Sequence, residues 1–191
     1  MKDLDWASLS FGYRRTDYNV RCYYRDGKWG EIEVCSDEYI NMHMAATCLH
    51  YGQEAFEGLK AYRCPDGKVR VFRMDENAKR LQSTCRGILM PEVPTEMFEE
   101  MVKKVVRLNQ EWIPTYESGA TLYIRPLLVG CQKLVLTVNP HEDYVTTVHF
   151  LILCLLVRVR HRRKSAGQTE LGPHGRSHEE VAQQQECYVR R

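Results

Sequence analysis

The sequence predicts a domain of mixed α/β (α+β) class over residues 1–154, built from a sheet and two main helices. Strand-like segments precede, separate and follow two helical segments, which is the order expected of that class. A hydrophobic share of 43% is typical of a globular chain that can bury a core. Residues 155–191 are polar and basic, and we expect them to form a mostly disordered tail.

The first strands are expected as two pairs around turn signals. Asp26-Gly27 separates the first pair and Pro65-Asp66-Gly67 the second, and both are residue combinations that favour tight turns. The flanking segments are rich in Val, Tyr and other residues favoured in strands. These segments are residues 18–25, 31–34, 61–63 and 69–73.

Two helices are expected next. Asp75 is a suitable cap for the first, which we expect to end at Gly87, where glycine suits a helix stop. Pro94-Thr95 opens the second, which we expect to continue until Pro114. Apolar residues recur on one face of the second helix, at Met97, Met101, Val105 and Leu108.

Two buried strands, residues 121–129 and 146–154, close the domain, and the composition changes after Cys154. From residue 155 onward there are eight Lys/Arg against four Asp/Glu, and five of these positive charges lie within residues 158–164. Few sizeable apolar residues remain, too few to offset the entropy of ordering the segment. The basic run could attract nucleic acid or another anion, but no aromatic residue interleaves it, so nucleic-acid binding is not favoured.

Several protein classes are disfavoured by the sequence. The sequence contains no run of about 18 apolar residues, so a membrane span is not expected. The amino terminus lacks the layout of a signal peptide. The eight cysteines include no C-x-x-C pair, so we expect reduced thiols in a cytoplasmic protein and neither a zinc site nor a disulfide scaffold. His43 lies between two methionines, which suggests packing rather than metal binding.

Four blocks of sequence are similar to those of branched-chain amino-acid aminotransferases. Residues 50–61, HYGQEAFEGLKA, match the family signature H-Y-x-x-x-x-F-E-G-x-K-A. The other blocks are Phe11-Gly12, residues 71–73 followed by 77–81, and residues 122–130. The resemblance extends over residues 11–154 and implies the small, N-terminal domain of a fold-type-IV enzyme that depends on pyridoxal phosphate.

The resemblance also implies roles for individual residues. Arg80 would lie near the start of a helix and bind the cofactor phosphate through paired hydrogen bonds; an ordinary solvated arginine is the alternative. Arg125 would lie on the same strand face as Tyr123 and pair with the second carboxylate of glutamate or 2-oxoglutarate, unless it has a permanent internal carboxylate. The wall for a leucine, isoleucine or valine side chain would be Phe11, Tyr51, Phe56 and Tyr123, for which core packing is the alternative.

The family's catalytic residue is not found in the sequence. The resemblance places the lysine that forms a Schiff base with pyridoxal phosphate in the large domain, before a Gly-Gly-Asn-Tyr motif, and that motif does not occur here. We therefore expect the chain to be a truncated aminotransferase, inactive alone. Residues 155–191 do not resemble the family, and a shifted reading frame is our hypothesis for them.

Two interpretations of the chain's role remain. One is a fragment of an enzyme that exchanges the amino group of branched-chain amino acids with 2-oxoglutarate. The other is a non-catalytic binding module that pairs with an intact subunit, because enzymes of this family are homodimers.

Overall fold

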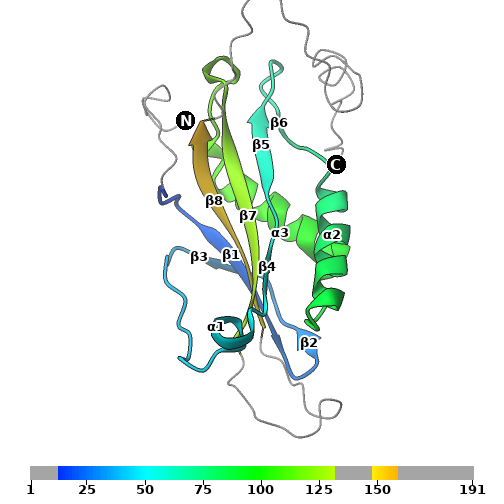
Figure 1. The fold of residues 1–191 in the computed structure, drawn as a ribbon. Coiled ribbons are helices and arrows are strands. Elements are labelled where there is room, and N and C mark those ends of the chain that lie inside the picture. The colour runs from blue at the N-terminus through cyan, green and yellow to red at the C-terminus, as the bar shows by residue number, and fades with distance from the viewer. Residues whose placement is uncertain (1–12, 132–147, 159–191) are drawn as a thin grey trace, which may run out of the picture.

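A computed structural model describes residues 13–131 and 148–158, with side chains described up to Cys154 (Figure 1). The predicted mixture of helices and strands is confirmed. All eight strands of the described residues belong to one antiparallel sheet, whose order is β2-β1-β8-β7-β5-β6, with β3 paired to β1 and β4 to β7. The strands are β1 (Asn19–Arg25), β2 (Lys28–Trp29), β3 (Glu33–Cys35), β4 (Glu54–Phe56), β5 (Leu59–Arg63), β6 (Val69–Val71), β7 (Ala120–Gly130) and β8 (Val148–Arg158).

The helices differ in length and position. The short α1 (Thr47–Tyr51) packs against the sheet face opposite to the two long helices, α2 (Met74–Gly87) and α3 (Thr95–Leu108). Two 3-10 turns, η1 (Gln110–Trp112) and η2 (Tyr116–Ser118), connect α3 to β7. Figure 1 shows α2 and α3 on one side of the sheet and α1 near the end of β7.

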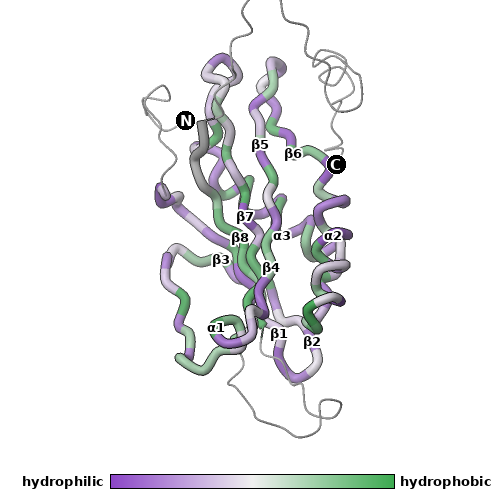
Figure 2. The backbone as a smooth tube through the Cα atoms, viewed as in Figure 1, coloured by the Kyte–Doolittle hydropathy of each residue, from purple (hydrophilic) through white to green (hydrophobic). Residues whose placement is uncertain are grey.

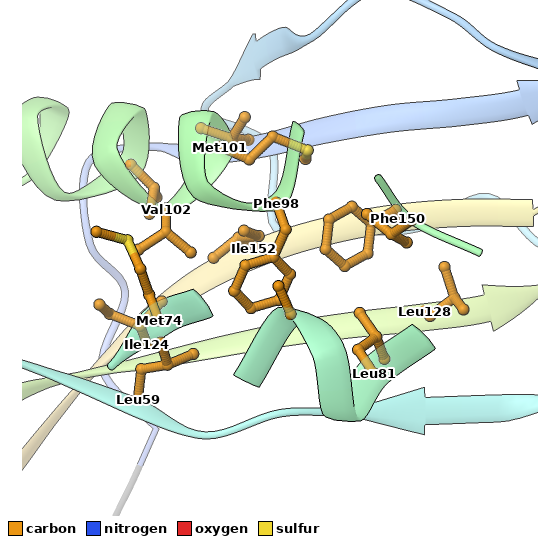
Figure 3. Close-up of a cluster of buried hydrophobic side chains, with 14 of the residues drawn as sticks. Leu59, Met74, Leu81, Phe98, Met101, Val102, Ile124, Leu128, Phe150 and Ile152 are labelled. Atoms are coloured by element: carbon orange, nitrogen blue, oxygen red, sulfur yellow. The ribbon is translucent and has the colours of Figure 1, made fainter. Parts of the chain in front are cut away.

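The main core lies between the sheet and the two long helices. Alternate residues of β7, including Leu122, Ile124 and Leu128, enter it and are fully buried. Phe98 of α3 stacks against Phe150 of β8, with ring centroids 6.1 Å apart (Figure 3). Hydrophobic residues concentrate in the strands at the middle of the sheet, whereas hydrophilic residues are frequent along α2 (Figure 2).

The opposite face of the sheet is only partly covered. A smaller cluster joins Ala46 and Cys48, beside and within α1, to Val129 and Leu151 of the sheet. The remaining odd-numbered residues of β7, such as Tyr123, Arg125 and Leu127, are half-buried on this side. We call this side the open face, and three of the predicted substrate residues lie on it.

Of three expectations about helix ends, one is confirmed and two were wrong. Asp75 is not the cap of α2, because Arg73 occupies the cap position in a left-handed conformation and Asp75 lies in the first turn. Gly87 is the last residue of α2, as expected, and Leu89 takes the left-handed conformation two residues beyond it. The second helix ends at Leu108 rather than at Pro114, because Asn109 caps it and a 3-10 turn follows.

The last strand is longer than expected. β8 continues past Cys154 to Arg158, and the backbone of residues 155–158 pairs with residues 120–123 of β7. The rest of the polar segment, residues 159–191, lies outside the described residues. The tail's disorder and its reading-frame hypothesis therefore stay predictions.

Candidate functional site

The site is built where β4 and β5 run beside β7 in a single register. Phe56 pairs with Leu127 and Leu59 with Ile124, so Glu57 lies opposite Pro126 and Gly58 opposite Arg125. The Glu57 N–H donates to the Pro126 carbonyl at 2.9 Å. Proline has no N–H to return this bond, and the ladder is interrupted there. Because side chains alternate along a strand, Phe56 faces the open side and Glu57 faces α2.

Phe56, Tyr123 and Arg125 meet on the open face. The Arg125 Cζ atom lies 4.2 Å from the centroid of the Phe56 ring and 5.2 Å from that of Tyr123. Arg125 Nη2 donates a hydrogen bond to the Tyr123 hydroxyl at 2.9 Å. The prediction that Tyr123 and Arg125 share one strand face is therefore confirmed.

Gly58 makes room for this arrangement. A Cβ atom added at Gly58 would overlap the Tyr123 hydroxyl and crowd its ring. Since Gly58 does not adopt a positive φ among the described residues, the glycine is required here by the close approach of the ring and not by backbone conformation. The Tyr123 ring can therefore approach the neighbouring strand closely.

Within the described residues, Arg125 has no carboxylate partner. Its buried Nε atom has no hydrogen-bond partner there either, and its contacts are with the two aromatic rings. The permanent internal carboxylate that was the alternative for Arg125 is thus not found in this part of the chain. A guanidinium in such a position can bind an external anion through its N–H groups while its flat faces contact aromatic rings.

Arg80 has the internal carboxylate instead. It lies in the second turn of α2, and its Nε and Nη2 donate to the two oxygens of Glu57 at 2.8 and 2.5 Å. Asn77 Nδ2 donates to the same carboxylate at 2.8 Å. The Glu57 hydrogen bonds, followed by its charge, raise the pKa of Arg80 above its ordinary value. The side chain of Arg80 is 67% exposed whereas that of Glu57 is 4% exposed.

This arrangement fits one end of pyridoxal phosphate. A guanidinium has five N–H donors, and Glu57 accepts two of them. The others lie on an exposed side chain, where a phosphate could accept them. Arg80 is thus neither an ordinary solvated arginine nor fully committed to an internal ion pair.

The other expected wall residues are less well placed by the structure. Tyr51 is the last residue of α1 and is 61% exposed. Within the described ranges we find no ring contact or hydrogen bond between Tyr51 and the cluster of Phe56, Tyr123 and Arg125. Phe11 lies outside the described residues. Phe56 is itself 62% exposed, which argues against simple core packing for that ring.

Sequence reasoning missed Glu57. The residue belongs to the recognised signature, but no role was assigned to it, because its partner Arg80 lies 23 positions away. The signal was a carboxylate between strand residues of a buried sheet, which requires a partner for its charge.

Residues 13–131 and 148–158 contain no group of residues that could hold a metal ion. Nor does any helix in these ranges have the length and apolar character needed to cross a bilayer.

Comparisons with known proteins agree with the resemblance seen in the sequence. The chain is 52% identical over 130 residues to a branched-chain-amino-acid aminotransferase of Haemophilus influenzae, a match that covers 68% of the chain and 38% of the relative. It is 41% identical over 154 residues to the aminotransferase of the same name from Helicobacter pylori, covering 81% and 44%. No protein-family model matches the chain.

Solved structures show the same likeness. The branched-chain amino acid aminotransferase of Escherichia coli has a TM-score of 0.51 at 28% identity, covering 73% of this chain and 41% of that one. The chain thus spans less than half the length of the relatives and structures it matches. Its described part is homologous to branched-chain-amino-acid aminotransferases and has the fold of the N-terminal domain of fold-type-IV aminotransferases.

Proposed function

We propose that the chain supplies the small-domain half of a branched-chain aminotransferase site. The observation that carries this proposal is the contact of the Arg125 guanidinium with the rings of Phe56 and Tyr123 on the open face. A cation held beside aromatic rings suits a site that takes two substrates in turn, one with an apolar side chain and one with an acidic side chain. The relatives' names supply the substrate class, branched-chain amino acids.

Each residue has a distinct role in this proposal. The exposed rings of Tyr51 and Phe56, together with Phe11 and Tyr123, would contact a leucine, isoleucine or valine side chain. Arg125 would bind the distal carboxylate of glutamate or 2-oxoglutarate. Arg80 would bind the phosphate of pyridoxal phosphate, which supplies the electron sink for amino-group exchange when it is bound.

We further propose that the chain does not catalyse the exchange by itself. The Gly-Gly-Asn-Tyr motif that marks the family's catalytic lysine is absent from its 191 residues. Transfer of the amino group requires that lysine to move a proton. Pairing with an intact subunit, as in the family's homodimers, would supply it.

The seven described cysteines are free thiols, which supports the cytoplasm as the compartment.

Cofactor binding tests the proposal directly. The full chain is titrated with pyridoxal phosphate, reduced with borohydride and analysed by mass spectrometry. We expect reversible binding that the Arg80→Ala variant loses, and no adduct on any lysine. A stoichiometric adduct on one lysine would refute the inactivity of the chain, and equal binding by Arg80→Ala would refute the phosphate role of Arg80.

Co-purification tests the pairing. The tagged chain is co-expressed with an intact aminotransferase of the same source, and the molar mass of the purified complex is measured by light scattering. A stable heterodimer supports a non-catalytic binding module. Recovery of the chain only as a monomer or as its own homodimer contradicts that role.

A further inference from the structure

Glu57 is a buried carboxylate at the edge of the proposed site. It is 4% exposed, and burial of a charged carboxylate is costly unless it is paired and hydrogen-bonded. Its backbone is fixed by the bond from its N–H to Pro126 of the central sheet. Its two oxygens accept hydrogen bonds from Arg80 and Asn77, both on α2.

The pairing of Glu57 with Arg80 has a definite geometry. Arg80 uses Nε and Nη2 together, so one edge of the planar guanidinium lies along the carboxylate. A planar group held by two parallel bonds cannot rotate freely about its own axis. The N–H groups that Glu57 does not accept, on Nη1 and Nη2, therefore have fixed directions on a side chain that is 67% exposed.

We propose that Glu57 is a positioning residue for Arg80: it orients the guanidinium so that its remaining N–H groups face a phosphate. This inference rests on the proposed function, because the phosphate contact of Arg80 belongs to that function. Asn77 supports the same carboxylate from one helical turn earlier and keeps it directed toward Arg80. Glu57 itself does not touch the phosphate.

Charge and positioning make opposite predictions for this residue. A carboxylate next to Arg80 repels an arriving phosphate, so by charge alone Glu57→Gln would tighten anion binding. If Glu57 orients Arg80, the same substitution weakens binding, because an amide has one acceptor oxygen and cannot replace the two oxygens that accept from Nε and Nη2 side by side. The sign of the change separates the two effects.

The experiment measures the dissociation constants of pyridoxal phosphate and of inorganic phosphate for the full chain. The wild type is compared with Glu57→Gln, Arg80→Ala and a control, Glu76→Gln. Glu76 lies one turn before Arg80 on α2, carries the same charge and pairs with Lys79 and Arg73 instead. We expect Glu57→Gln to weaken both probes on the order of tenfold, as loss of an outer partner does at metal sites, whereas Glu76→Gln leaves them unchanged or tighter.

A spectroscopic readout accompanies the titrations. In the wild type the Nε–H proton of Arg80 is expected to exchange slowly with solvent, because Glu57 accepts it. In Glu57→Gln we expect this proton to exchange fast, while the thermal midpoint of unfolding of the domain stays unchanged. Asn77→Ala, which keeps the Glu57 charge and loosens its carboxylate, should weaken phosphate binding several-fold and serves if Glu57→Gln does not fold.

The outcomes separate the two proposals. Equal phosphate binding by the wild type and Arg80→Ala overturns the phosphate role of Arg80 in the proposed function and, with it, this inference. Phosphate binding that depends on Arg80 but is unchanged or tightened by Glu57→Gln overturns the inference alone. Weakening by Glu57→Gln together with loss of Arg80 proton protection supports both.

Discussion

Tyr123 lies over Gly58, and the two residues decide together where Arg125 is held. The ring fits because the neighbouring strand has no side chain at this point. Arg125 then bonds to the Tyr123 hydroxyl and stacks on Phe56. The geometry of this cluster on the open face therefore depends on a residue that has no functional group.

Gly58→Ala should displace the Tyr123 ring and lower the free energy of unfolding by about 1–3 kcal/mol, as overpacking of a filled site does. Urea unfolding measures the change. The hydroxyl is the atom nearest to the added methyl group, so Tyr123→Phe in the same chain should recover part of the loss. Strictly additive effects of the two substitutions would contradict this contact.

His149 predicts a pH dependence of stability. Burial, followed by the charges of Arg25 and Arg21, lowers the pKa of His149 from its ordinary value of 6.5. The unfolded chain therefore takes up this proton at a higher pH than the folded chain, and the stabilising contribution is present above pH 6.5 and is lost as the pH falls below it.

Urea unfolding between pH 7.5 and 5 tests the His149 effect, with His149→Phe as the comparison. The phenylalanine keeps an aromatic ring against Tyr23, which His149 contacts edge-on with the two ring centroids 4.7 Å apart. We expect the variant to lose less stability than the wild type over this range. Parallel curves for the two proteins would show that His149 does not titrate as stated.

Residue pairs were predictable from the sequence only where they are local. Tyr123 and Arg125 could be assigned to one face because they are two positions apart on one strand. The partnership of Glu57 with Arg80 joins a strand end to a helix turn, and no periodicity relates them. The roles of Phe11 and Tyr51 depend on contacts that the described residues do not supply.

Helix α2 ends at Gly87 as predicted, but the left-handed residue beyond its end is not a glycine. The Met90 N–H bonds to the Cys85 carbonyl and Leu89 adopts a φ of 55°. This is the arrangement of a Schellman motif, in which glycine is usual at the left-handed position. Here leucine occupies that position, and Gly87 is the last residue of the helix.

Two substitutions at the end of α2 should each stabilise the domain. Leu89→Gly relieves the left-handed conformation of an exposed leucine, and we expect a gain of about 1 kcal/mol. Gly87→Ala adds a methyl group that meets no atom within 4 Å, with an expected gain of about 0.5–1 kcal/mol. Both are measured by urea unfolding. A loss of stability in Gly87→Ala would mean that the glycine, and not Leu89, ends the helix.

Long elements with clear turn signals were predicted well from the sequence. The strands around Asp26-Gly27 appear as β1, β2 and β3, and α3 begins at Thr95 as expected. The short α1 and β4 were not predicted, because five and three residues are too few to show a period. Their positions follow from packing on β7, which is a tertiary effect.

The whole sheet is organised around β8, although it is the last described strand in the chain. β8 lies between β1 and β7, and it pairs with β7 along eleven residues of each strand (Figure 1). No feature of the local sequence predicts this order, because it depends on pairing between segments at opposite ends of the domain. The class of fold was predictable and the strand order was not.

A shortened chain tests the importance of the β8 extension. A chain that stops after Cys154 loses the backbone pairs of residues 155–158 with β7, whereas one that stops after Arg158 keeps them. We expect the shorter chain to be less stable by about 2 kcal/mol, from several lost backbone hydrogen bonds. Chemical unfolding of the two chains measures the difference, and equal stability would show that the domain ends at Cys154.

The central place of β8 also sets an order of events on the ribosome. Synthesis runs from the amino terminus, so β1 and β7 leave the exit tunnel before the strand that joins them. Until β8 emerges, both strands present unpaired backbone edges, which are available to other chains. The nascent domain therefore passes through a stage in which chaperone binding or pairing with another strand competes with its own completion.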